Sequence, residues 1–261
     1  DGPFEVETWS PDFEDTSRPT NPNGGFEGSA SRVLPATVWV PAVDVPVPLV
    51  IYGHGFMSQR TDNRVEMELL ASHGFVVAAV DFPLTNRGAP GGANVVDIEN
   101  QPGDVSFLID QLVAASADGT SPVAGKVDAD RVGIVGVSLG ALTALITAFH
   151  PSYLDDRIDA VVTAAPPACY APVQLLSDRS LPLLIVQGDN DSIVPFDANA
   201  VPAYEAAIAP KALLTILNGN HTNFANAATL LDALPNADTV GCTAIASQIP
   251  LDQVGVLAER L

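Results

Sequence analysis

The chain has 261 residues, of which 47% are hydrophobic and 16% charged, and its 31 acidic and 11 basic side chains give a formal net charge of -20. This hydrophobic content excludes wholesale disorder, and the acidity argues against nucleic-acid binding, which needs basic side chains to neutralise phosphates. No apolar run approaches the roughly 18 residues that a membrane span requires. We therefore expect a globular protein without a membrane span.

Short apolar segments alternate with segments of helical spacing along the chain. In chain order we expect strands at Pro3–Trp9, Arg32–Val40 and Leu49–Tyr52, a helix at Thr61–Ser72, a strand at Phe75–Val80, a helix at Asp104–Ala115, a strand at Arg131–Val135, a helix at Leu139–Phe149, strands at Ala160–Ala165 and Leu183–Gln187, a helix at Ala198–Ala209, a strand at Ala212–Leu217 and a helical C-terminal stretch. Such alternation is typical of a mostly parallel sheet with helices on both faces. No linker or internal repeat divides the chain, so we predict an α/β fold in a single domain over residues 1–261.

The end of the strand Arg131–Val135 carries the most specific motif in the chain. Gly136-Val-Ser-Leu-Gly140 matches G-x-S-x-G between a strand and a helix, the context in which this motif presents a nucleophilic serine. The turn is so sharp that side chains two positions before and after the serine would collide, which explains both glycines. The motif predicts Ser138 as a nucleophile above the sheet, and the alternative is a glycine-rich turn without chemistry.

A carboxylate is expected after the strand Leu183–Gln187, because such sheets bind their ligands outside the carboxyl ends of the strands. The loop Gly188-Asp-Asn-Asp-Ser-Ile-Val-Pro195 offers Asp191, our choice, and Asp189, the runner-up, as the acid of a catalytic triad. Asp and Asn are also common turn residues, so a purely structural loop is the alternative.

Four histidines are available as the base of such a triad. Three of them have structural explanations, one shaping the exit loop of a strand and two standing at helix ends: His54, His73 and His150. His221 follows a late strand, Ala212–Leu217, downstream of the acid. The order Ser138, Asp191, His221 is that of an α/β-hydrolase triad.

From end to end the chain resembles an α/β-hydrolase, and particular segments narrow the likeness. Ile51-Tyr-Gly-His-Gly-Phe-Met57 and Leu70-Ala-Ser-His-Gly-Phe-Val-Val-Ala-Ala-Val80 resemble secreted esterases of the dienelactone-hydrolase and platelet-activating-factor-acetylhydrolase type. The chain is also similar to bacterial cutinases and polyester hydrolases, whose acid and histidine loops look like Gly188–Pro195 and Gly219–Phe224. The likeness covers roughly residues 30–225.

The resemblance implies an oxyanion hole formed by the backbone N–H groups of Leu139 and Phe56, with the N–H of Met57 as the nearby alternative. Preorganised donors of this kind stabilise the charge of the tetrahedral intermediate by about 3–4 kcal/mol each. We expect the side chains of Phe56 and Met57 to contact substrate. For the Phe56 ring, packing beneath its own loop is an equal alternative.

Two departures from these relatives limit the substrate. The polyester hydrolases place a Trp after the strand that matches Ala160–Ala165, where this chain has Ala165-Pro166-Pro167, so activity on aromatic polyesters is not implied. The cysteine nucleophile of dienelactone hydrolases is also absent, so their reaction is not implied. The segment Pro166–Pro182 is too short for a helical lid domain, and we expect an open site without a large lid.

These observations predict a monomeric serine carboxylic-ester hydrolase that acts through an acyl-enzyme on short- to medium-chain or polymeric esters. A triad of Ser138, Asp191 and His221 needs no cofactor. The acidic loops lack the Asp-x-Asp-x-Asp-Gly spacing of a calcium site, so we expect no metal. The alternatives are an amidase or peptidase that uses the same triad and a non-catalytic binding module on a hydrolase scaffold.

The two cysteines and two glycosylation sequons bear on maturation. Cys169 and Cys242 are predicted to form a disulfide, with two unpaired buried thiols as the alternative. The sequons Asn190-Asp-Ser192 and Asn220-His-Thr222 each enclose a predicted triad residue, where a glycan would block the site. We therefore expect secretion without glycosylation, from a bacterial cell to the periplasm or the outside.

Overall fold

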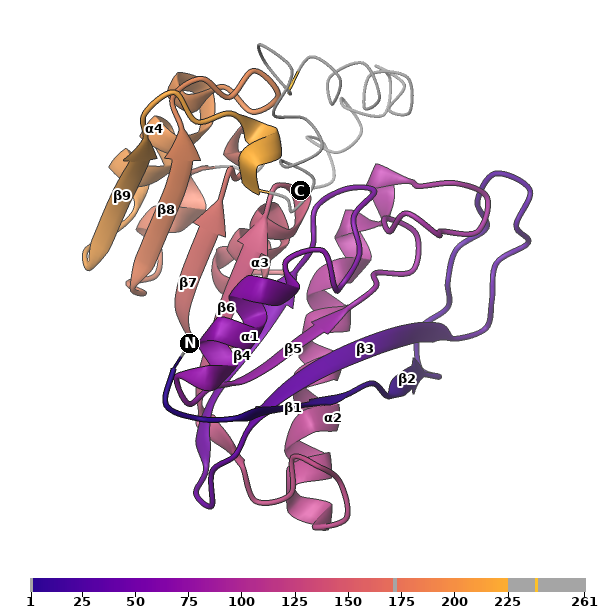
Figure 1. Ribbon diagram of the computed structural model, residues 1–261. Coiled ribbons are helices and arrows are strands. Elements are labelled where there is room, and N and C mark those ends of the chain that lie inside the picture. Colours follow the sequence, from indigo (N-terminus) through magenta and orange to yellow (C-terminus); the bar gives the residue numbers. More distant parts are fainter. Residues whose placement is uncertain (1, 171–172, 225–237, 239–261) are drawn as a thin grey trace.

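The computed structural model describes residues 2–170, 173–224 and 238. Within them, nine strands form one sheet in the order β1-β3-β5-β4-β6-β7-β8-β9, with β2 paired to β3 (Figure 1). The strands are β1 Val6–Trp9, β2 Asp12–Asp15, β3 Arg32–Pro41, β4 Val47–Gly53, β5 Val76–Val80, β6 Val127–Val137, β7 Ile158–Ala164, β8 Leu183–Gly188 and β9 Lys211–Ile216. The helices are α1 Arg64–Ser72, α2 Gln101–Asp118, α3 Leu139–Phe149 and α4 Phe196–Ala206, with the short 3₁₀ turns η1 Val95–Asn100, η2 Ala168–Tyr170, η3 Val173–Ser177 and η4 His221–Phe224.

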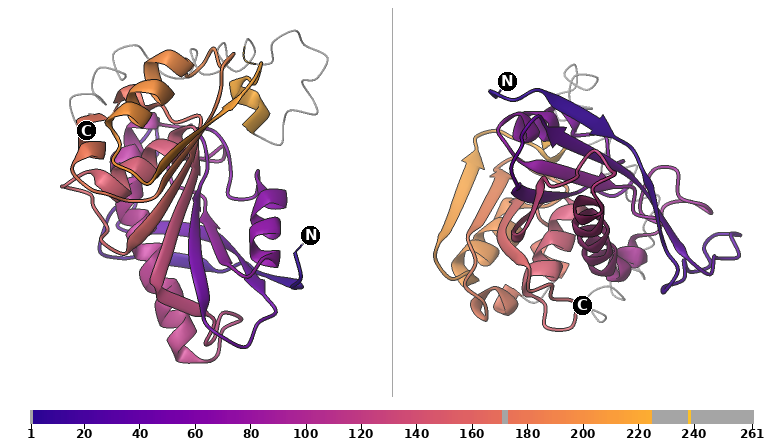
Figure 2. Two further views of the ribbon diagram at one scale, coloured as in Figure 1. Left: turned by 90° about the vertical axis from the view of Figure 1, so that its left-hand side faces the viewer. Right: turned by 90° about the horizontal axis from the view of Figure 1, so that it is seen from below.

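The sheet is mostly parallel, as predicted. From β5 through β4, β6, β7 and β8 to β9, every neighbouring pair is parallel, whereas β3 is antiparallel to β1, β2 and β5. The edge-on view shows α1 on one face and α2, α3 and α4 on the other (Figure 2). The expected α/β class, with helices on both faces, is therefore confirmed.

Burial on both faces explains why the central strands are apolar at nearly every position. Successive side chains of a strand point to opposite faces. In β4, Leu49 and Ile51 join the large core beneath α2, α3 and α4, while Val50 and Tyr52 join a smaller core beneath α1. The parallel strands thus need hydrophobic side chains at consecutive positions and end together at one edge, which brings their exit loops close to one another.

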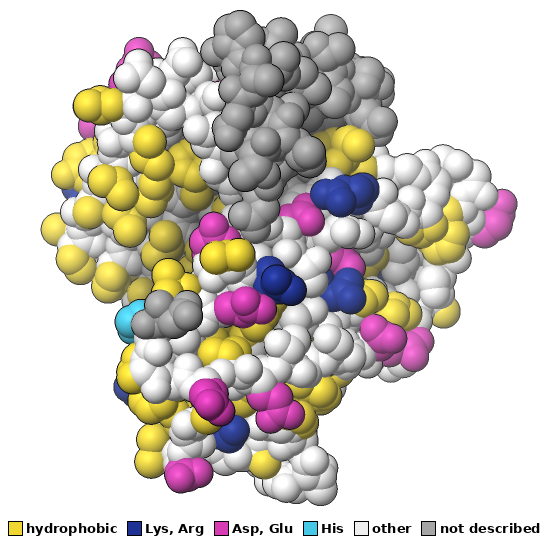
Figure 3. Space-filling model, in the orientation of Figure 1, with side chains coloured by type: hydrophobic (Ala, Val, Ile, Leu, Met, Phe, Trp, Pro, Cys, Tyr) yellow, Lys and Arg dark blue, Asp and Glu magenta, His cyan; other side chains and the backbone are white. Residues whose placement is uncertain are grey.

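The face of β9 turned away from α4 is different. Its strand alternates between half-buried and exposed side chains, and the exposed ones include Leu214 and Ile216, with Leu217 following. A hydrophobic surface is visible over this part of the sheet (Figure 3). α1 covers the sheet beside β3 and β5, so the cover expected on this second face is not continuous among the described residues.

Three helices differ from the predicted boundaries. α1 begins at Arg64 instead of Thr61, because the backbone of Asn63, its N-cap residue, is not helical, with φ -107° and ψ 37°. The Asn63 side chain bonds with the Tyr52 hydroxyl and the Phe224 carbonyl. α2 begins earlier, at Gln101, since proline is tolerated in a first helical turn, and it ends at Asp118, before Gly119 with its φ of 75°. α4 begins at Phe196 instead of Ala198 and ends at Ala206 instead of Ala209, because the backbone of Ala207 is extended, with φ -64° and ψ 146°.

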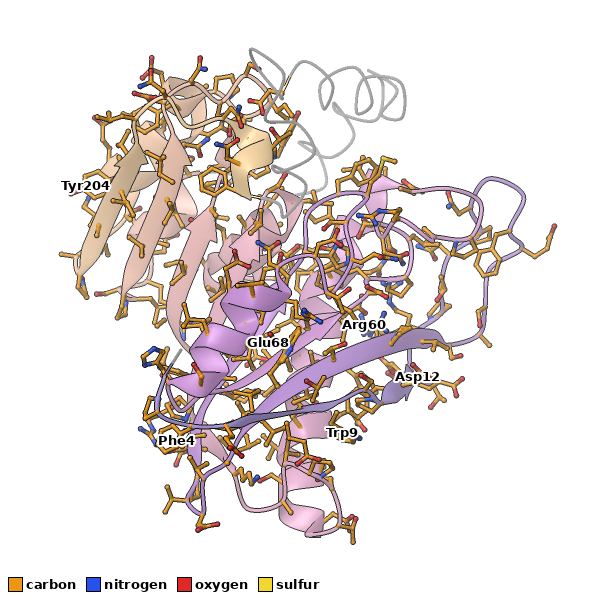
Figure 4. The ribbon with its side chains drawn as sticks, viewed as in Figure 1. Phe4, Trp9, Asp12, Arg60, Glu68 and Tyr204 are labelled. Carbon is orange, nitrogen blue, oxygen red and sulfur yellow. The ribbon has the colours of Figure 1, made fainter. Side chains whose placement is uncertain are left out.

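The remaining differences concern β2 and the C-terminal stretch. The sequence does not predict β2, because Phe13 is the one hydrophobic residue of this edge strand. The Phe13 ring packs edge-on against Trp9, which is labelled in Figure 4. The helix predicted for the C-terminal stretch lies outside the described residues.

No helix in the described ranges is long and apolar enough to cross a membrane. Between β7 and β8 the described residues form only η2 and η3, so no helical lid domain is inserted there.

Candidate active site

Ser138 stands at the sharp turn between β6 and α3. Its backbone has φ 54° and ψ -119°, a conformation that is strained for a residue with a side chain. The turn is held because the Ser138 N–H donates to the Ala164 carbonyl at 2.8 Å and the helix α3 starts directly behind it. Ser138 is half-buried, so its hydroxyl remains accessible from the carboxyl edge of the sheet.

The two glycines of the motif are required by backbone contacts. A Cβ on Gly136 would lie 2.1 Å from the Gly140 carbonyl oxygen, and a Cβ on Gly140 would lie 2.1 Å from the Gly53 carbonyl oxygen. The backbones of β4, β6 and α3 therefore touch at this point. The collision expected from the sequence is confirmed, and the contact with β4 is an additional reason for Gly140.

Asp191 follows β8 and is almost completely buried. Its Oδ1 accepts from the backbone N–H groups of Ile193 at 3.0 Å and Val194 at 2.7 Å, and its Oδ2 accepts from Gln187 Nε2 at 2.8 Å. These donors fix the carboxylate with Oδ2 directed at the ring of His221, and Oδ2 and Nδ1 lie 2.8 Å apart.

His221 begins η4, after β9. Its Nε2 lies 2.9 Å from Ser138 Oγ, and its Nδ1 faces the Asp191 carboxylate. With Nδ1 as the donor to a carboxylate, a neutral imidazole has Nε2 free to accept the serine proton. The structure thus brings together the three residues that the sequence selects as a triad. The runner-up, Asp189, is exposed and accepts instead from the Asn218 N–H at 2.6 Å.

The loop after β4 lies directly against Ser138. A Cβ on Gly55 would stand 3.4 Å from Ser138 Cβ, and the Gly55 carbonyl accepts from His54 Nδ1 at 2.7 Å and from the Ser58 N–H at 3.1 Å. The C=O and N–H of a trans peptide point in opposite directions, so these bonds turn the Phe56 N–H away from them. The alternative donor, the Met57 N–H, is already bonded to the Thr85 carbonyl at 2.8 Å.

His54 shapes this loop, as the sequence suggests. Its ring is fully buried, and its Nε2 accepts from the Phe82 N–H at 3.1 Å while Nδ1 donates to Gly55. Farther along the same loop, Arg60, labelled in Figure 4, pairs with Asp81 after β5 and also donates to Thr37. The loop that carries Phe56 is therefore fixed from both sides by buried or half-buried polar groups.

Replacement of His54 by alanine is expected to destabilise the protein at about pH 8 by about 1–3 kcal/mol, because the Phe82 N–H loses its acceptor inside the core. Burial lowers the pKa of the His54 imidazole below its ordinary value of 6.5. As the pH falls through that value, the ring takes up a proton in the unfolded chain but stays neutral in the folded protein. The stabilisation by His54 is therefore complete above that pH and shrinks below it.

Denaturant unfolding of the wild type and His54→Ala between about pH 8 and pH 5 measures this effect. The difference in the free energy of unfolding should narrow toward pH 5, and a gap that widens toward acid would contradict the assigned hydrogen bonds.

A hydrophobic cluster lies next to the turn at Ser138. Leu139 packs with Val95 of η1 and with Leu142 of α3, and the half-buried Phe56 packs against this cluster. The Phe56 residue therefore packs against the core and stays partly exposed, and its contact with substrate stays a prediction. Tyr170 of η2 packs against the same cluster and was not selected from the sequence.

One prediction concerns a disulfide, and two residues next to the site were not predicted. Cys169 is exposed and forms no disulfide within the described part of the chain, and its predicted partner Cys242 lies outside the described residues. Gln187, which holds Asp191, was missed, although a buried polar side chain at the end of an apolar strand is a detectable signal. Asp238, which contacts the backbone of His221, has no local sequence signal at all.

A mostly parallel sheet, with a serine on a strained strand-to-helix turn and an acid and a histidine after two later strands, defines the α/β-hydrolase fold. The model of the PET hydrolase-like family matches residues 38–234, and the chain belongs to this family. It is also similar to the cutinase est1 of Thermobifida alba, with 24% identity over 187 residues that cover 71% of this chain and 57% of the relative. The chain thus spans less than two thirds of the length of that relative. The predicted likeness to cutinases and polyester hydrolases is confirmed.

Proposed function

We propose that this protein is a carboxylic-ester hydrolase that uses Ser138, His221 and Asp191 as a catalytic triad. The observation that carries the proposal is the continuous chain of hydrogen bonds from Ser138 Oγ to His221 Nε2, 2.9 Å, and from His221 Nδ1 to Asp191 Oδ2, 2.8 Å. The strained conformation of Ser138 supports it, since such strain gathers at functional sites.

The geometry supports the following sequence of steps. His221 Nε2 takes the proton from Ser138 as the serine oxygen attacks the ester carbonyl carbon, and Asp191 stabilises the resulting imidazolium. The alkoxy group then leaves with that proton, and an acyl-enzyme remains on Ser138. Water attacks the acyl carbon with His221 again as base, which releases the acid. The N–H groups of Leu139 and Phe56 are the proposed donors to the oxyanion.

The proposed substrates are short- to medium-chain or polymeric esters. The family is described as PET hydrolase-like and the relative is a cutinase, so esters of a polymer are the natural comparison. The half-buried Phe56 beside Leu139 supplies an apolar surface for an acyl or aromatic group. The proposal includes export from the cell, because a polymer cannot enter a cell. It also includes a monomeric state.

Rates on matched p-nitrophenyl esters and p-nitroanilides test the reaction type, with acyl groups from acetyl to palmitoyl. We expect faster hydrolysis of the esters, and we expect a fluorophosphonate probe to label Ser138 in a tryptic peptide. Faster cleavage of the anilides would establish an amidase instead. A folded protein that neither hydrolyses an ester nor reacts with the probe would be a binding module.

A further inference from the structure

Beyond the triad, the two loops that carry Asp191 and His221 share a second, buried carboxylate. Asp238 is 0% exposed. Its Oδ2 accepts from the His221 N–H at 3.0 Å and from the Ser192 N–H at 3.0 Å, and its Oδ1 accepts from the Thr222 N–H at 2.9 Å. The Ser192 hydroxyl lies 3.4 Å from the same Oδ2. One carboxylate therefore binds the backbone of both catalytic loops.

These contacts are placed where the loops need support. The bonds of the triad hold side chains, whereas Asp238 holds the backbone N–H of His221 itself and of the residue directly after Asp191. The N–H groups at the start of a helical turn have no partner within the turn, and His221 and Thr222 begin η4. A charged acceptor makes stronger hydrogen bonds than a neutral one, particularly away from water.

Other links between the two loops lie at their bases. The Asn190 N–H donates to the Gly219 carbonyl at 3.0 Å, and the exposed Asp189 accepts from the Asn218 N–H. These bonds continue the pairing of β8 with β9 and do not reach the residues that follow Asp191 or begin η4. Asp238 supplies the link at the level of the catalytic groups. It also lies after residue 234, where the match to the family ends.

We propose that Asp238 is a positioning residue for the reaction. Its carboxylate sets the distance between the acid loop and the histidine loop, so that the His221 ring reaches both Asp191 and Ser138. This inference rests on the proposed function. The alternative is a residue that stabilises the fold without any effect on the alignment of the triad.

The test compares Asp238→Asn and Asp238→Ala with the wild type in the full chain, using p-nitrophenyl butyrate. Asn keeps an acceptor facing His221 and Ser192 but turns an N–H₂ group toward the Thr222 N–H, while Ala removes every acceptor. We expect kcat to fall by about 10- to 100-fold in Asp238→Ala, by less in Asp238→Asn, and KM to stay unchanged. The control Asp189→Asn, which weakens the exposed link between the same loops, should retain the wild-type kcat.

Proton NMR provides a readout that does not need turnover. In the wild type, the His221 Nδ1 proton bonded to Asp191 should give a strongly downfield resonance, and the amides of Ser192, His221 and Thr222 should exchange slowly. Both signatures should be lost in Asp238→Ala while the bulk of the spectrum stays folded. Where Asp238→Ala does not fold, Asp238→Asn carries the same comparison.

The inference is wrong if a folded Asp238→Ala keeps the wild-type kcat and the downfield resonance. It is also wrong if kcat falls only in proportion to the folded fraction of the sample. Failure of the proposed function looks different, because the wild type would then lack ester hydrolysis while its three amides remain protected by Asp238.

Discussion

Replacement of Ser138 by alanine is expected to lower kcat for ester hydrolysis by on the order of 10⁶-fold, as loss of the nucleophile does in serine hydrolases. In the proposed mechanism the Ser138 oxygen is the atom that bonds to the acyl carbon, and it lies 2.9 Å from His221 Nε2, the proposed base. Residual activity above the uncatalysed rate is expected to come from substrate binding and the two oxyanion donors.

The fold of Ser138→Ala should be unaffected. The bond of the Ser138 N–H to the Ala164 carbonyl does not involve the side chain, and alanine meets the same backbone strain at φ 54° as serine does. Thermal unfolding and kcat, measured on the same sample, check both parts of this prediction. Ser177→Ala, at an exposed serine whose hydroxyl donates to the Gln174 carbonyl, is the matched control and should keep its activity. Full activity in Ser138→Ala would mean that another residue is the nucleophile.

Replacement of Gly140 by alanine is expected to destabilise the protein by about 3 kcal/mol and to lower kcat by at least about 10²-fold. The new Cβ would lie 2.1 Å from the Gly53 carbonyl oxygen and 2.7 Å from the His54 carbonyl oxygen. Both are backbone atoms, so the clash cannot be relieved by a side-chain rotation. α3 must move away from β4, and this separates Ser138 from the loop that carries Phe56.

Gly133→Ala is the control for this substitution. Gly133 lies in the same strand that leads to Ser138, but a Cβ there would have its nearest neighbours at 3.7 Å and 3.9 Å, an ordinary packing distance. Its stability and kcat should match the wild type. Denaturant unfolding and p-nitrophenyl ester hydrolysis of both variants provide the comparison, and equal behaviour of the two would contradict the proposed role of the close backbone contact at Gly140.

Local patterns were sufficient to predict most of the fold. α3 covers Leu139–Phe149 as expected, and the central strands were detected because both of their faces are buried and both are therefore apolar. The glycines on either side of Ser138 indicated a sharp turn, since their requirement arises within a few residues of the chain. Elements with one apolar residue, such as β2, were missed because their stability comes from pairing with β3.

The choice between chemically equal residues was decided by the tertiary structure. Asp189 and Asp191 are two positions apart in the same loop, and the turn formed by Ile193 and Val194 around the carboxylate directs Asp191 at His221. In the same way, the N–H groups of Phe56 and Met57 are neighbours, and a contact with the Thr85 carbonyl after β5 engages Met57.

The sequence by itself therefore determined the sheet, the turn at Ser138 and the residues able to form a triad, because these depend on hydrophobic spacing and on backbone sterics within one segment. Only the tertiary structure decided which carboxylate oxygen faces His221 and that the Met57 N–H is bonded to the Thr85 carbonyl. Those contacts join the exit loops of different strands and reach Asp238, 17 positions after His221. Their geometry depends on how the loops pack against one another, and a local sequence pattern does not determine that packing.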